Sequence, residues 1–190
     1  MKDVNFKPVE NDVLFVDAPS YDDLMPRGSL ARMVDEFVNS VVPEDVKSAY
    51  SRQGQNGYSP YGMLKAILFA YAVNVYSCRE IYTLLGHDLR ASYFLGYARP
   101  GYNTINSFRA RRLGNGYVND IFRQFATMLL DRGLIDVVKV NIGRGASRES
   151  RLMIMWRSRP RKIARTKKER KANADIANRL VKQIAAAVMN

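Results

Sequence analysis

Residues 59–113 read SPYGMLKAILFAYAVNVYSCREIYTLLGHDLRASYFLGYARPGYNTINSFRARRL. The stretch opens with a serine that can cap a helix and with Pro60 at the first helical position, where the missing N–H costs nothing. Apolar residues then recur at helical spacing, which predicts a helix over residues 60–75 with one wide apolar face. Aromatic residues at helical spacing are usually buried, so this helix is predicted to form the middle of the core. The alternative is that its tyrosines stack on nucleic-acid bases.

Two further helix starts follow in the same stretch. Ser77 and Glu80 fit the S-x-x-E capping box, in which the serine accepts from a backbone amide and the glutamate reaches back. The proline–glycine pair at residues 100–101 marks a turn, after which Asn103 or Thr104 can cap a third helix. This third helix is rich in arginine. Two short helices with a turn-rich connection, the second of them basic, predict a helix-turn-helix-like element that reads DNA.

The segment before this stretch adds an arm and a helix. Residues 1–27 have the pattern of an extended arm, which proline and glycine interrupt. Ser29 then caps a helix that is predicted to end near Val41. Pro43 can begin another short helix, because proline suits the first helical position.

After the arginine-rich helix the pattern changes from helix to strand. Residues 118–130 form a long amphipathic helix that stops at Gly133, the position after a helix that favours glycine. Residues 134–142 contain a β-branched run typical of a strand, and residues 152–156 have a second strand-like pattern. A terminal amphipathic helix is predicted over residues 172–188, where apolar residues return to helical spacing.

Positive charge is concentrated in one late segment. The whole chain has a formal net charge of +12. Residues 1–143 hold sixteen Lys and Arg against fifteen Asp and Glu, whereas residues 144–171 hold twelve against two. Such a basic block attracts polyanions, nucleic acid among them, without reading sequence, and the plainer alternative is a solvated basic tail.

The composition excludes several classes of protein. Hydrophobic residues make up 47% of the 190 residues, which is a globular composition. No apolar run approaches the roughly 20 residues that span a bilayer, and the first residues lack the apolar core of a signal peptide. A single cysteine, Cys78, rules out an internal disulfide, and with His87 as the only histidine a zinc site of the usual kind cannot form.

An ordered set of short motifs resembles a known family. Tyr58-Ser59-Pro60, residues 64–71, residues 77–81 and residues 103–109 are similar to the N-terminal domain of DDE-type insertion-sequence transposases. The order and spacing of the motifs are kept over about half the chain. The resemblance implies a bacterial cytoplasmic, nucleoid-associated protein that binds the terminal inverted repeats of its element. It also implies an RNase H-like catalytic domain with three acidic ligands for magnesium.

The family pattern breaks after the first predicted strand. In the family this strand is followed by Asp-Gly-Thr-Lys, and that aspartate is the first metal ligand. Here the matching residues 143–145 are Gly-Arg-Gly. Two-metal phosphoryl transfer needs several carboxylates that converge on the metal ions. The acidic residues after residue 142 are Glu149, Glu169 and Asp175. They lie in basic or helical segments of the sequence.

We therefore expect no catalytic residue, no metal site and no cofactor in this chain, although the family implies magnesium. The hypothesis is a truncated or frameshifted transposase that cannot cut or join DNA alone. The alternative origin is a shortened reading frame that uses its basic tail.

The predicted fold is mainly α. A helical bundle with the helix-turn-helix-like element is followed by a remnant strand of an incomplete RNase H-like domain and by a basic helical tail. The predicted divisions are an N-terminal arm over 1–28, the helical transposase domain over 29–133, remnant strands over 134–158, and the tail with its helix over 159–190.

The favoured function is DNA binding by the helical domain. Arginines on the third helix are assigned to the groove or to phosphates, and the arginines and lysine of the tail add charge. The alternative for these arginines is a surface helix whose side chains pair with Asp88, Asp120 or solvent. The second function is a regulatory fragment that forms a homodimer or a mixed assembly and inhibits the full-length transposase. The predicted DNA-binding residues are Arg79, Arg90, Arg109, Arg111, Arg112, Arg159, Arg161 and Lys162.

Overall fold

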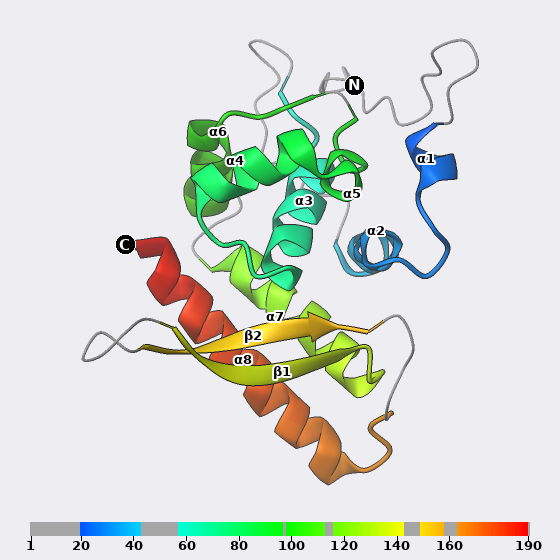
Figure 1. The fold of residues 1–190 in the computed structure, drawn as a ribbon, viewed down its shortest axis with the longest axis vertical. Coiled ribbons are helices and arrows are strands. Elements are labelled where there is room, and N and C mark those ends of the chain that lie inside the picture. Colours follow the sequence, from blue (N-terminus) through cyan, green and yellow to red (C-terminus); the bar gives the residue numbers. More distant parts are fainter. Residues whose placement is uncertain are drawn as a thin grey trace, which may run out of the picture. The chain divides into compact units, whose positions relative to one another are not determined.

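The computed structural model describes residues 20–42, 57–96, 98–112, 116–142, 149–157 and 163–189. Helices dominate these ranges, and their two strands form one antiparallel sheet, so the predicted mainly α fold is confirmed (Figure 1). The chain divides into two compact units. Unit 1 comprises Met1–Ala70 and Ser77–Val118, and unit 2 comprises Tyr71–Tyr76 and Asn119–Asn190. Within the described ranges, every helix is too short or too polar to cross a bilayer.

Unit 1 is organised around a helix that is apolar on all sides. Leu64, Leu68 and Phe69 of this helix, α3, are fully buried, which is the pattern of a helix surrounded by others. Its single lysine, Lys65, pairs with Asp35 of α2 at 2.7 Å. The helical elements are α1 (Tyr21–Leu24), α2 (Leu30–Val41), α3 (Pro60–Ala72), α4 (Cys78–His87), α5 (Leu89–Ser92), α6 (Tyr102–Ser107) and a π-helix (Phe108–Arg112).

The starts of two of these helices were predicted correctly from their capping residues. The Ser29 hydroxyl accepts from the Arg32 amide at the start of α2, which ends at Val41 as predicted. At the start of α4, Ser77 and Glu80 form both bonds of the predicted capping box. These caps were predictable because each joins residues only three apart.

Other predicted boundaries were wrong. The third helix begins at Tyr102 with Gly101 at the cap position and no side-chain cap, so neither predicted capping residue acts there. The helix predicted over 60–75 ends at Ala72, because Asn74 adopts φ 66°. Part of the predicted extended arm is helical, since Ser20 and Asp23 form a capping box that starts α1. Residues 1–19 and the predicted helix start at 43 lie outside the described residues.

Unit 2 is built from two helices and a hairpin. Its elements are α7 (Tyr117–Asp131), β1 (Ile135–Ile142), β2 (Glu149–Trp156) and α8 (Lys167–Met189). At the end of α7 the Leu134 amide donates to the Leu129 carbonyl and the Gly133 amide to the Leu130 carbonyl, with Gly133 at φ 66°. These two backbone hydrogen bonds form a Schellman motif, which agrees with the helix end that the glycine predicted. Both predicted strands are confirmed, whereas α8 begins earlier than predicted.

The early start of α8 has a local cause. Thr166 accepts from the Glu169 amide, and Glu169 accepts from the amide and hydroxyl of Thr166. The pair forms a T-x-x-E capping box within a run of basic residues, which the helix predicted from the sequence did not include.

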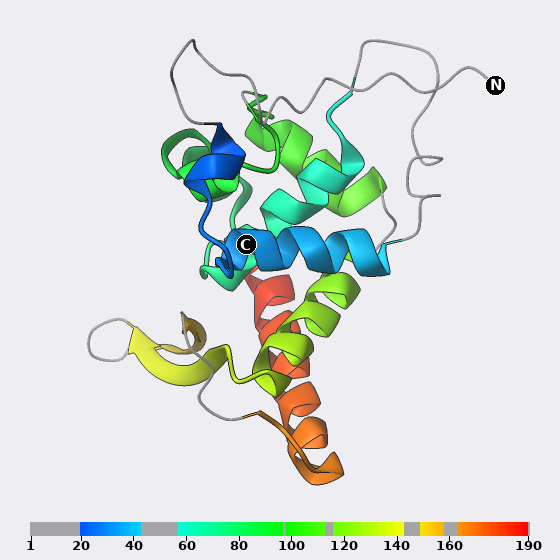
Figure 2. The same ribbon diagram turned by 90° about the vertical axis from the view of Figure 1, so that its right-hand side faces the viewer.

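The hairpin is held by side-chain amides along the outer edge of β2. The Asn74 amide accepts from the Ile154 N–H at 2.7 Å and donates to the Ile154 carbonyl at 2.9 Å. Gln183 of α8 does the same for Leu152, at 2.6 and 2.9 Å. Helices α7 and α8 lie on the same side of the sheet in both views (Figures 1 and 2). One face of the hairpin is therefore backed by helices, and one of its edges is closed.

Candidate nucleic-acid interface

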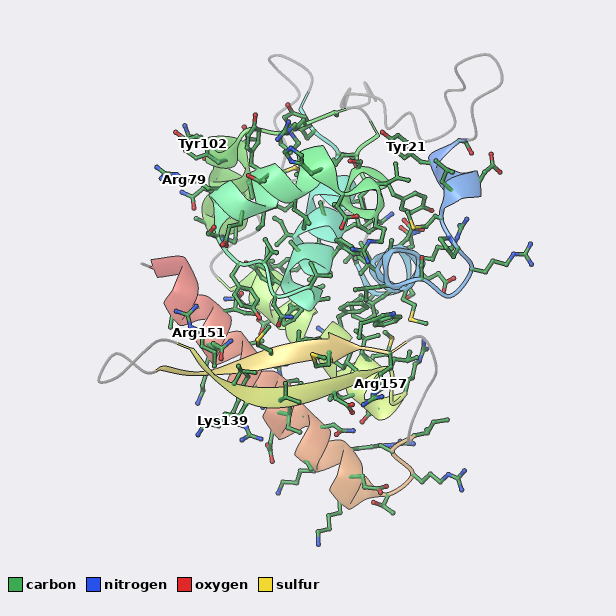
Figure 3. All side chains as sticks on the ribbon, in the orientation of Figure 1. Tyr21, Arg79, Tyr102, Lys139, Arg151 and Arg157 are labelled. Carbon is green, nitrogen blue, oxygen red and sulfur yellow. The ribbon has the colours of Figure 1, made fainter. Side chains whose placement is uncertain are left out.

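An arginine lies at the exposed start of α4. The capping box of Ser77 fixes the first turn of this helix, and Arg79 follows in it with an exposed side chain. The Arg79 guanidinium lies 5.7 Å from the centre of the Tyr102 ring at the start of α6. Tyr102 is 45% exposed, and Figure 3 shows both side chains together at the outer surface of unit 1. A cation over an aromatic ring is held in place without being neutralised.

A weak polar contact also joins α4 to α6. The Cys78 thiol lies 3.8 Å from the Asn106 side-chain oxygen, between the two helices. Burial raises the pKa of Cys78, and this outweighs the nearby positive charge of Arg109. The thiol is therefore uncharged at neutral pH and acts as a packing residue at this junction.

The connection between α4 and α6 is long for a helix-turn-helix element. Residues 88–101 separate the two helices and include α5. Helix-turn-helix motifs use a turn of about 3–4 residues. Both helices that the sequence predicted are present, and the helix-turn-helix arrangement itself stays a prediction.

Predicted DNA-binding residues occupy different environments. Arg79 is exposed beside Tyr102, whereas Arg109 is half-buried behind the Cys78 junction. Arg111 and Arg112 lie in the π-helix, and their side chains are outside the described part. Arg79 therefore lies in α4, whereas Arg109 lies in the π-helix that follows α6 and is near Cys78 of α4. Arg159, Arg161 and Lys162 lie outside the described residues.

Arg90 forms an ion pair with Asp88, the residue that caps its own helix, α5. Its guanidinium donates to both carboxylate oxygens of Asp88, at 3.0 and 2.7 Å, and lies 5.4 Å from the centre of the buried Phe69 ring. Burial of Asp88 favours its neutral form, but the bonds from Arg90 outweigh this effect and lower the pKa of Asp88. The sequence offered Asp88 as an alternative partner for the arginines of the third helix, whereas in the structure it pairs with Arg90.

We expect Arg90→Ala to lower the free energy of unfolding by about 1 kcal/mol at pH 7 and to leave DNA affinity unchanged. A partly exposed ion pair contributes roughly 0.2–1 kcal/mol, and a cation–π contact about 0.5–1 kcal/mol. Because the folded pKa of Asp88 is lowered, the ion-pair part is present above about pH 4 and is lost as the pH falls through that lowered pKa. Urea unfolding of both proteins at pH 7 and pH 3 measures the effect. A difference in the free energy of unfolding between the two proteins that is the same at both pH values would contradict this prediction.

Arg99, which the sequence did not single out, clamps α4 from the following loop. Its guanidinium lies 4.1 Å from the centre of the Tyr82 ring and donates to the Tyr82 carbonyl at 3.2 Å. It occupies the space beside Gly86, where a Cβ would lie 2.2–2.5 Å from its atoms. The glycine in α4 therefore makes room for this arginine.

Sequence reasoning missed Tyr102 as well as Arg99. Tyr102 comes directly after the predicted turn at 100–101, where the sequence pattern indicates only a helix cap. A large aromatic residue at the first exposed turn of a short polar helix was the available signal. Nothing in the sequence indicated that this helix would lie beside the start of α4.

The residues described do not fit a magnesium site. No three His, Cys, Asp or Glu side chains among them come together. Asp136 is the second residue of β1, and its carboxylate is bound by Arg157 across the hairpin. A carboxylate in a salt bridge of this kind is a poor match for a metal that needs several converging carboxylates.

Comparison with known families agrees with the residues that the motifs covered. Residues 19–111 match the family model described as a transposase domain (DUF772). This region of the chain is thus a transposase domain. In particular, it is the N-terminal region of an insertion-sequence transposase, which confirms the resemblance. No curated protein and no solved structure shows a significant match to the chain.

Proposed function

We propose that this chain is a DNA-binding region of a DDE-type transposase and that it recognises the terminal inverted repeats of its element. The observation that carries the proposal is the Arg79–Tyr102 pair, an exposed cation held over an exposed ring within the matched transposase domain. Phosphate groups are bound by such exposed guanidinium groups, and an adjacent ring offers a surface against sugar or base.

The position of Arg79 adds to the support. It lies in the first turn of α4, where backbone N–H groups and the helix dipole also favour an anion. Beside it, the exposed side of α6 carries small polar residues, Asn103, Thr104 and Ser107. Polar side chains of this kind bond both phosphate oxygens and base edges. The two short helices thus place a positively charged side chain, Arg79, next to the exposed polar side chains of α6.

We expect Arg79→Ala to weaken binding of inverted-repeat duplex about tenfold and to reduce the slope of log affinity against log salt by about 1. Tyr102→Leu should weaken binding less, because the arginine remains but is no longer held in place. Fluorescence anisotropy over a series of salt concentrations measures both quantities.

Arg27→Ala is the matched control, because Arg27 is also an exposed arginine of unit 1 but lies between α1 and α2. It should change affinity and slope far less than Arg79→Ala. Equal effects of the two variants would mean that only net charge matters and that the Arg79–Tyr102 pair is not the contact. Absence of any duplex binding by the unmodified chain would overturn the proposal itself. Light scattering on the same samples then tests the regulatory alternative.

A further inference from the structure

The charge of the two units is very unequal. Unit 2 carries seventeen Lys and Arg against six Asp and Glu, whereas unit 1 carries thirteen against twelve. The Arg79–Tyr102 pair belongs to unit 1, which is almost neutral. The strongest attraction for a polyanion therefore arises in a unit to which no binding site has been assigned.

A groove lies between the two helices of unit 2, α7 and α8. The helices run in roughly opposite directions in both views (Figures 1 and 2), and the Asn173 amide of α8 donates to the Asp131 carboxylate at the end of α7, at 2.7 Å. The volume of the groove is about 520 Å³. Its lining residues on α7 recur every three or four positions and so form one side of that helix. The lining residues are Arg123, Gln124, Thr127, Met128, Asp131, Arg132, Ala174 and Asn178.

The lining of this groove suits an anion that accepts hydrogen bonds. The side-chain amides of Gln124 and Asn178 are exposed and can donate hydrogen bonds. Asp131, the one acid among these lining residues, is already bound by Asn173. Pockets for drug-like small molecules are lined mainly by apolar and aromatic side chains, whereas Met128 is the one large apolar residue in this lining. The groove is therefore better suited to charged groups than to an apolar ligand.

Two arginines of α7 lie in the groove. Arg132 is exposed and forms no ion pair among the described residues. Arg123 is also exposed, and its partner Asp120, at 3.2 Å, is itself a surface residue. Because an ion pair between exposed groups contributes little to stability, a phosphate group can compete for Arg123.

Helix α8 adds lysines along the other side of the groove. Lys171 lies three residues before Ala174 and Lys182 lies four residues after Asn178, so helical spacing places both lysines next to the lining. Both lysines are exposed, and neither forms an ion pair among the residues that the structure describes. Because the two helices run in opposite directions, the groove has one lysine and one arginine toward each of its ends.

We propose that the groove between α7 and α8 binds the phosphate backbone of duplex DNA, with Arg123 and Arg132 on one wall and Lys171 and Lys182 on the other. Backbone phosphates match this groove because they carry regularly spaced negative charges and oxygen atoms that accept hydrogen bonds. The inference rests on the proposed function, since it adds a second contact to the same DNA. It differs from the basic block seen in the sequence, because three of these four cations lie outside residues 144–171.

Two variants of α8 test the proposal, because Ala174→Glu and Ala172→Glu add the same charge to the same helix. Ala174 lines the groove, whereas Ala172 is exposed and lies roughly 160° away around the helix. We expect Ala174→Glu to weaken duplex binding about tenfold and Ala172→Glu to weaken it far less. Anisotropy with the full chain measures the affinities, and thermal unfolding checks that each variant folds as the unmodified chain does.

Arg132→Ala is the second variant, and it decides the matter if Ala174→Glu fails to fold. Arg132 is exposed, so its removal leaves the packing of α7 intact. We expect this variant to weaken duplex binding and to reduce the slope of log affinity against log salt by about 1. Unchanged affinity and slope would remove Arg132 from the contact.

Each result has a distinct meaning. Equal losses of affinity in Ala174→Glu and Ala172→Glu would mean that only net charge matters and that the groove is not the binding site. If Ala174→Glu binds duplex as the unmodified chain does while Arg79→Ala binds it more weakly, the inference fails and the proposed function stands. If Ala174→Glu changes self-association in light scattering without a change in DNA affinity, the groove is a contact between copies of the chain. If the unmodified chain binds no duplex, the proposed function fails together with this inference.

Discussion

Replacing Gly62 with alanine is expected to lower the free energy of unfolding by about 2 kcal/mol, although alanine is the better helix former. Gly62 lies in α3, and a Cβ at this position would be 2.6 Å from the Phe94 carbonyl oxygen and 2.9 Å from Leu95 Cδ2. Phe94 and Leu95 are buried, and a backbone oxygen cannot rotate away. Overpacking of this kind costs typically 1–3 kcal/mol or more, which exceeds the roughly 1 kcal/mol that helix propensity returns.

Gly86→Ala is the matched control, because Gly86 is also helical and also lacks space for a Cβ. Its neighbour is the guanidinium of Arg99, which is the free end of a flexible side chain. Alanine should displace Arg99 from the Tyr82 ring at a cost of about 0.5–1 kcal/mol and gain a similar amount from helix propensity. Urea unfolding should show a large loss at Gly62 and almost none at Gly86. A Gly62→Ala protein as stable as the unmodified chain would show that α3 and the 94–95 turn are not in close contact.

The second large effect is expected at Asn74, whose side chain joins two segments eighty residues apart in the sequence. Asn74→Ala should cost about 3 kcal/mol. Two hydrogen bonds to the buried Ile154 backbone are lost, at roughly 1 kcal/mol each, and alanine at φ 66° adds about 1–2 kcal/mol of backbone strain. The Tyr76 hydroxyl donates to the same Asn74 oxygen at 3.1 Å, which fixes the orientation of the amide.

Asn74→Gly separates these two contributions, since glycine adopts positive φ without strain but supplies no amide. We expect it to be about 1 kcal/mol more stable than Asn74→Ala and still about 2 kcal/mol less stable than the unmodified chain. Gln183→Ala removes the corresponding bonds to Leu152 without any change of backbone strain, and it should cost less than Asn74→Ala. If Asn74→Gly unfolds at the same urea concentration as the unmodified chain, the amide bonds do not stabilise the hairpin.

The first of these substitutions bears on the proposed DNA contact. Gly62 sets the packing of α3 against the residues that follow α5, in the unit that carries Arg79 and Tyr102. Asn74 holds strand β2 of unit 2. Loss of affinity in either variant therefore has to be compared with its loss of stability before it is assigned to DNA contact.

The sequence by itself determined those helix ends that are set by contacts between residues close in the sequence. Ser29 begins α2, the Ser77–Glu80 box begins α4, and Gly133 ends α7, each at the position predicted. The transposase resemblance was also readable, because it depended on ordered short motifs along the chain. These features were accessible because the interacting groups lie within about five residues of each other.

Only the tertiary structure decided what each arginine does. Arg79, Arg90 and Arg99 look alike in the sequence, yet one lies exposed over Tyr102, one is paired with Asp88 and one clamps α4 beside Gly86. A long, flexible side chain takes its partner from whichever segment packs nearby, and most such partners are distant in sequence. The energies involved, about 1 kcal/mol each, are no larger than the local preferences that a sequence pattern reveals. The sequence therefore located the helices and the family, and the packing of those helices decided which arginine side chains stay exposed for the proposed DNA contact.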